Sequence, residues 1–185
     1  RIPGVLSQNG PVAGMHPTLD PAPTGHTKIQ CRWCVCRGRG QGAWGVVVRD
    51  STGEVVAARA GRIDHVADAF STELRAVGQA LDLAAELGVV RLTVEMDALM
   101  LEQALNRRVP DCSRQAQAIE DIKVQSRLWF STCVFAHCKR EANMPAHHMA
   151  RLGLSHQVGD TLVADHVLPA NVAEFVMGDS AQLVS

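Results

Sequence analysis

Two acidic residues in the middle of the chain stand at positions from which a fold can bring them together around a metal ion. Glu73 lies in a run whose apolar residues repeat at helical spacing, with Phe70 three residues before it and Val77 four residues after it. It therefore borders the buried stripe of the predicted helix, where an unsatisfied carboxylate is unfavourable. Asp97 ends the run 92–97, which reads as a strand. A helix acid and a strand-end acid, brought together, can hold a metal ion.

Each acid also has a structural interpretation. Asp97 can cap a helix that begins near Ala98, because aspartate is a favoured N-cap residue. Glu73 can lean out into solvent. Spacing alone leaves the metal site and these structural roles open.

Composition limits the class of protein. The 185 residues fit one domain with tails, and a hydrophobic share of 46% permits a buried core. The net charge of −1 means that nucleic acid would be bound by a local basic patch. No apolar run is long enough to span a membrane, and the N-terminus lacks the apolar core of a signal peptide. The six unevenly spaced cysteines are not a secreted disulfide framework, which favours an intracellular location, cytoplasm or nucleus.

The order of predicted elements defines an α/β architecture. Residues 1–27 are predicted to be a disordered proline-rich linker, 28–154 a domain and 155–185 a tail. Strands are predicted at 28–36, 43–49, 54–59, 91–96 and 128–135, and helices at 67–87, 98–106, 113–126 and 144–152. A turn at 50–53 joins two strands into a hairpin, and Gly88 ends the long helix. The strand–helix–strand units require parallel pairing, so we expect a mixed five-stranded sheet with helices on both faces. Asp97 then falls at the carboxyl end of a parallel strand.

Four motifs, in this order, resemble the ribonuclease H domain. They are Gly42-Ala-Trp-Gly-Val-Val-Val-Arg-Asp-Ser-Thr-Gly53, Ser71-Thr-Glu-Leu-Arg-Ala76, Val94-Glu-Met-Asp97 and His137-Cys-Lys-Arg-Glu-Ala-Asn143. The chain is most similar to the reverse-transcriptase-like branch that is abundant in plants and found in retroelements. The resemblance covers about 28–154.

The resemblance implies an RNase H-like fold and hydrolysis of the RNA strand of an RNA–DNA hybrid. The family uses two magnesium ions held by four acids; one ion activates water and the other steadies the leaving oxygen. By the resemblance, Glu73 and Asp97 are metal ligands and catalytic residues. His137 matches a mobile histidine that assists proton transfer or product release. Asn143, with the neighbouring Arg140, is the expected substrate-binding pair.

Two positions depart from the family pattern. Arg32 stands where the first-strand acid belongs, and it puts a fixed positive charge where a cation should bind. His147 stands where the last-helix acid belongs, as plant members of this branch often show. Histidine can ligate metal and is counted here with the catalytic candidates, but it suits magnesium poorly.

Other groups of residues have weaker interpretations. Cys31, Cys34 and Cys36, with Cys133 and Cys138, lack the paired C-x-x-C spacing of a zinc site. The pairs Arg37/Arg39, Arg107/Arg108 and Lys139/Arg140 are candidate phosphate contacts, with a solvated surface as the alternative. Trp44 and Trp129 are predicted to be core residues on strands.

Two hypotheses follow. The first is a metal-dependent RNase H-type endonuclease that acts on RNA–DNA hybrids and is impaired by the two replacements. The second is a catalytically dead retroelement remnant that at most binds nucleic acid. In both, the expected partner is nucleic acid and not a membrane, and the chain is a monomeric domain of a larger polyprotein or derived gene.

The genetic code suggests why the first motif is missing. Read one nucleotide out of frame, the codons for Gln30 to Val35 can encode Asn-Val-Asp-Gly-Ala-Phe, which is the family motif with its acid at position 32. Only the glycine is forced; the other residues are permitted choices. We hypothesise that about 30–39 is translated in a shifted frame. A gene without GAT or GAC one base out of frame across codons 32 and 33 would rule this out.

Overall fold

The computed structural model describes residues 25–36, 41–66, 68–109, 113–157 and 161–165. The strands are β1 (Thr27–Cys36), β2 (Gln41–Arg49), β3 (Val55–Asp64), β4 (Arg91–Met96), β5 (Thr132–His137) and β6 (Thr161–Asp165). The helices are α1 (Ala69–Glu86), α2 (Leu99–Asn106), α3 (Ala116–Trp129) and α4 (Met144–Gly153), with a short 3-10 turn, η1 (Glu141–Asn143), before α4. Within these residues, no helix is both long and apolar enough to cross a membrane.

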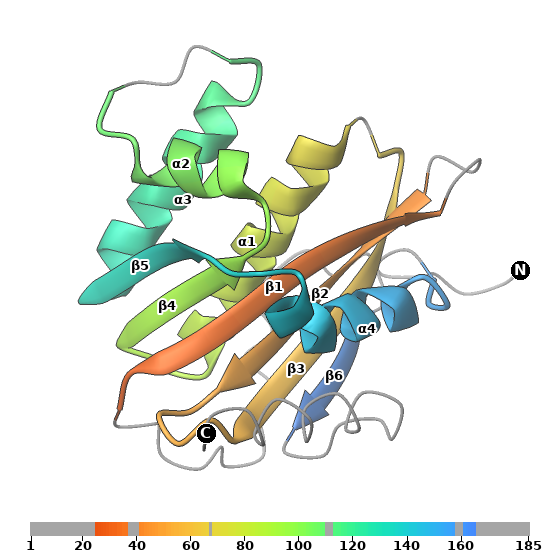
Figure 1. Cartoon of the computed structure of the whole chain (residues 1–185), viewed down its shortest axis with the longest axis horizontal. Coiled ribbons are helices and arrows are strands. Elements are labelled where there is room, and N and C mark those ends of the chain that lie inside the picture. Colours follow the sequence, from red (N-terminus) through yellow and green to blue (C-terminus); the bar gives the residue numbers. More distant parts are fainter. Residues whose placement is uncertain (1–24, 37–40, 67, 110–112, 158–160, 166–185) are drawn as a thin grey trace, which may run out of the picture.

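A single mixed sheet organises the elements, in the order β5-β4-β1-β2-β3-β6 (Figure 1). The β1–β2 and β2–β3 pairs are antiparallel, whereas β1–β4 and β4–β5 are parallel. This confirms the predicted mixed sheet of five strands, β1 to β5. A sixth strand, β6, pairs antiparallel with β3 and lies in the segment predicted as a tail.

Alternating residues of the central strands point to opposite faces of the sheet and are buried there in two hydrophobic clusters. Ile29 of β1 and Val46 of β2 belong to the core cluster that contains the inner residues of α1, such as Val77. Val47, the next residue of β2, packs in a separate cluster with Met149 of α4. Because successive strand residues point to opposite faces, α1 and α4 cover opposite sides of the sheet. Helices on both faces were the sequence expectation.

The turn and cap signals of the sequence are confirmed. In the 50–53 turn, Asp50 accepts hydrogen bonds from the backbone N–H groups of Thr52 and Glu54, and Gly53 adopts a φ of 90°. Gly88 follows α1 with a φ of 68°, in the left-handed region that glycine tolerates. The first signal forms the turn that joins the two hairpin strands, and the second ends the helix that carries Glu73.

The predicted strand 128–135 was wrong in its first part. Leu128 and Trp129 complete α3, and β5 begins only at Thr132. A short apolar run cannot by periodicity alone be assigned to a strand or to the end of a helix. Trp129 is consequently not a core residue, since half of its surface is exposed, whereas Trp44 on β2 is buried as predicted. The predicted linker lies almost wholly outside the described residues.

Candidate active site

Asp97, the residue after β4, meets Arg32 in the middle of the parallel strand β1. Gln30 of β1 lies opposite Glu95 of β4, so Arg32, two residues further on, lies beside Asp97. The Nη1 group of Arg32 donates to Oδ2 of Asp97 in an ion pair. Both side chains are largely buried, with exposed fractions of 9% for Arg32 and 14% for Asp97. The position of the missing first-strand acid is therefore inside the candidate site, and a guanidinium fills it.

Two further groups surround the Asp97 carboxylate. The Nε atom of Arg140 lies 3.6 Å from Oδ2, and the Nδ2 group of Asn143 lies 3.4 Å from Oδ1. Asp97 does not cap α2: the N-cap position is Ala98, and no side chain caps the helix there. That structural interpretation of Asp97 was wrong, because its carboxylate is turned toward the cationic and amide groups of β1 and η1.

Glu73 faces the same place from α1. It is half-buried, and it lines one small pocket together with Arg32 and Asp97. Burial raises the pKa of the Cys31 thiol, and Cys138 and the Glu73 charge raise it further. Glu73 is thus within electrostatic range of the strand that carries Arg32. Helix α1 and strands β1 and β4 each bring one charged side chain to this pocket.

Hydrogen bonds fix η1 against β1. The Nδ2 group of buried Asn143 donates to the carbonyl oxygen of Cys31 at 3.0 Å, and Nε2 of Gln30 donates to the carbonyl oxygen of Ala142 at 2.6 Å. These bonds fix the segment that directly follows Arg140, whose Nε atom contacts Asp97. Sequence reasoning found Asn143 through its motif but missed Gln30, since a lone glutamine in a strand carries no signal of its own.

The two histidine candidates lie in different surroundings. His147, in the first turns of α4, has its pKa lowered by burial and then by the nearby charges of Arg32, His148, Arg151 and Arg140. His147 therefore lies within electrostatic range of Arg32 and Arg140, the two arginines that contact Asp97. His137 ends β5 with an exposed side chain that makes no hydrogen bond or ion pair with any described residue.

The charged pocket does not fit a magnesium ion. Magnesium requires oxygen ligands around a vacant position, and the Arg32 guanidinium already occupies the contact with Asp97. His147 replaces an oxygen donor with a nitrogen donor. Among the residues that the structure describes, no group of three or more His, Cys, Asp or Glu side chains is arranged to hold a metal ion.

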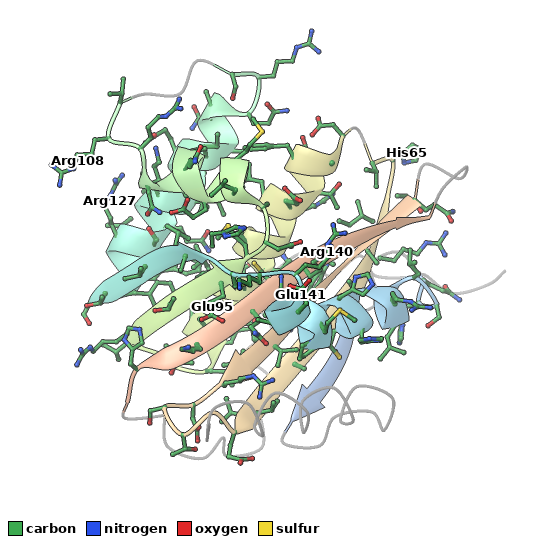
Figure 2. All side chains as sticks on the ribbon, viewed as in Figure 1. His65, Glu95, Arg108, Arg127, Arg140 and Glu141 are labelled. Carbon is green, nitrogen blue, oxygen red and sulfur yellow. The ribbon has the colours of Figure 1, made fainter. Side chains whose placement is uncertain are left out.

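The remaining candidates are scattered. In Figure 2, Arg140 and Glu141 lie over β1 beside the start of α4, whereas Arg108 and Arg127 lie on the α2–α3 side of the molecule. Arg37 and Arg39, and the side chains of Cys34 and Cys36, are outside the described residues. Of the other cysteines weighed for zinc, Cys31 is buried, and Cys133 and Cys138 are half-buried.

The sheet order, the helices on both faces and the acids on α1 and β4 define an RNase H-like α/β domain. The chain belongs to the reverse transcriptase-like family, whose model matches residues 32–153. No curated protein matches the chain in sequence.

Solved structures share the fold. The RNase H1 of the halophilic archaeon Halobacterium salinarum is 24% identical with a TM-score of 0.55, over 70% of this chain and 96% of its own. LC11-RNase H1 in complex with an RNA/DNA hybrid is 19% identical with a TM-score of 0.61, over 70% and 99%. The N-terminal RNase H domain of a Mycobacterium tuberculosis protein is 17% identical with a TM-score of 0.60, over 88% and 100%.

Proposed function

We propose that this chain is an RNase H-type domain that binds RNA–DNA hybrids and in which magnesium-dependent hydrolysis of the RNA strand is strongly impaired. The observation that carries the proposal is the buried ion pair of Arg32 with Asp97. A fixed guanidinium at the centre of the acidic pocket neutralises one ligand and repels a divalent cation.

The binding part of the proposal has separate support. Two proteins with similar folds, LC11-RNase H1 and a foamy viral protease-reverse transcriptase, have structures in complex with an RNA/DNA hybrid. In this chain, Arg140 is mostly exposed and is held at the pocket by the η1 hydrogen bonds, where a backbone phosphate can reach it. Asn143 acts as the positioning residue for that loop.

Glu73 and Asp97 are the two acids that remain at the positions of the family's magnesium ligands, in a pocket that Arg32 now occupies. His147 takes the place of the last acid, and His137 that of the mobile histidine. We place the domain at about 28–154, with β6 adding a strand to its sheet, in a larger retroelement-derived protein. The second candidate function is a catalytically dead retroelement remnant that at most binds nucleic acid. The Arg32–Asp97 pair supports this function as well, because it blocks the same site.

Cleavage and binding of one labelled RNA–DNA hybrid test the proposal together. We expect the native chain to retard the hybrid and to leave its RNA strand intact in magnesium. The Glu73→Gln variant should bind the hybrid and leave the RNA strand intact to the same extent, because Glu73 does not support cleavage in the native chain. Robust magnesium-dependent cleavage that disappears in Glu73→Gln would refute the impairment. A native chain that fails to bind the hybrid would refute the function as a whole.

A further inference from the structure

Basic side chains lie on one face of α4 and in the loop before it. We define the α4 patch as Arg140, His147, His148 and Arg151. His147 and Arg151 are four residues apart on α4 and His148 and Arg151 three apart, which places these side chains on neighbouring positions of one helix face. The rings of His147 and His148 contact edge to face, with centroids 5.8 Å apart.

Positive charge reaches this patch from three elements. Burial lowers the pKa of His147, and the charges of Arg32 on β1, Arg140 in the loop before η1 and Arg151 on α4 lower it further. Burial also lowers the pKa of His148, and the Arg151 charge adds to this effect. An anion bound near His147 therefore lies in the positive field of Arg140 and Arg151, whereas Arg32 is already paired with Asp97.

The Arg32–Asp97 pair changes what the pocket can bind. In a magnesium site, carboxylates repel a phosphate until metal ions bridge the two. Here Arg32 neutralises Asp97 inside the protein, so that this repulsion is reduced without a metal ion. The close contact to Asp97 is already made by Arg32, and Arg140, whose side chain is 74% exposed, can offer its guanidinium to solvent.

We propose that the α4 patch, seated on the Arg32–Asp97 pair, binds a phosphodiester group of a nucleic-acid backbone directly and without a metal ion. A planar guanidinium pairs with two phosphate oxygens at once, which suits Arg140 and Arg151 to this role. The acidic groups near the patch are Glu141, which is exposed beside Arg140 (Figure 2), and the Asp97 and Glu73 carboxylates of the adjoining pocket. The inference deepens the proposed function and rests on it.

Fluorescence anisotropy of a labelled RNA–DNA hybrid, at constant ionic strength with magnesium or with EDTA, tests the inference. We expect the native affinity to be undiminished in EDTA. Arg140→Ala and Arg151→Ala should each weaken binding and lower the slope of log affinity against log salt by about 0.9, the value for one lost phosphate contact. Glu141→Gln should tighten binding, because it removes the repelling charge.

Arg127→Ala supplies the matched control, since Arg127 is an exposed arginine near the end of α3, away from the patch (Figure 2). It should leave both the affinity and the salt slope at the native values. Hybrid binding that is lost in EDTA, or that is equally insensitive to all three arginine variants, overturns the phosphate site and leaves the proposed function standing. No hybrid binding by the native chain overturns both.

Discussion

Replacing Arg32 with aspartate is expected to give the chain magnesium-dependent nuclease activity. The Arg32→Asp variant removes the guanidinium from Asp97 and adds a carboxylate at the position of the family's first-strand acid. The pocket then offers three carboxylates, and the double variant Arg32→Asp/His147→Asp offers four. We expect cleavage of a labelled RNA–DNA hybrid to rise by on the order of 100-fold or more in the double variant, the scale of restoring a preorganised electrostatic contact.

Arg32→Asn is the matched control, because it removes the same charge and supplies no carboxylate. It should stay nearly inactive while folding normally. The activity of the double variant should vanish in EDTA. It should also vanish when Glu73→Gln is introduced as a third substitution. If the double variant folds and binds hybrid but cleaves no faster than the native chain, Arg32 is not what blocks the site.

Replacing Gly45 with alanine is expected to be the most destabilising small substitution in the sheet. A Cβ atom at this position of β2 would lie 2.2 Å from the backbone nitrogen of Ala150 and 2.5 Å from the carbonyl oxygen of Ala146. Both atoms belong to the backbone of α4, which cannot move aside without leaving the sheet. We expect the free energy of unfolding to fall by about 3 kcal/mol, near the upper end for overpacking. Thermal or denaturant unfolding measures it.

Gly78→Ala is the same chemical change with the opposite expected sign. Its Cβ would meet only the Cδ1 atom of Ile122, at 3.4 Å, and alanine in the middle of α1 is a better helix former than glycine. We expect it to stabilise the chain by about 0.5–1 kcal/mol. A Gly45→Ala variant as stable as the native chain would mean that α4 does not pack on β2 this closely, and the position of His147 would then be in doubt.

The central strands and helices were predictable because their local signals agree with one another. Strand β4 has the predicted bounds, and α1 begins and ends within two residues of them, since its apolar stripe, Asp68 N-cap and Gly88 all mark the same helix. The end of α3 was not predictable in this way. Leu128 and Trp129 are apolar but exposed, so hydrophobicity there does not report burial. Strand β6 was not predicted either, because its pairing with β3 is a long-range contact that leaves no local pattern in the sequence.

The site was predictable in its members but not in its contacts. Motif positions were enough to name Glu73, Asp97 and His147, and to identify Arg32 as a departure from the family pattern. That Arg32 would turn inward and pair with Asp97 is set by the register of β1 on β4, which the sequence does not encode locally. The support of η1 by Gln30 depends likewise on tertiary contact. Placed beside Asp97, position 32 is also where the shifted reading frame would supply the family's aspartate, so the gene sequence bears directly on the origin of the site.

Calorimetric titration of magnesium into the native chain tests the central claim, that the Arg32 guanidinium occupies the place of the metal. The account predicts no saturable binding by the native chain and clear binding by Arg32→Asp/His147→Asp under the same conditions. The bound ion should also raise the stability of that double variant, by about 2.7 kcal/mol at a hundredfold excess over the dissociation constant. Saturable magnesium binding to the native chain that is abolished by Glu73→Gln would contradict the claim, because the pocket would then hold its ion in spite of Arg32.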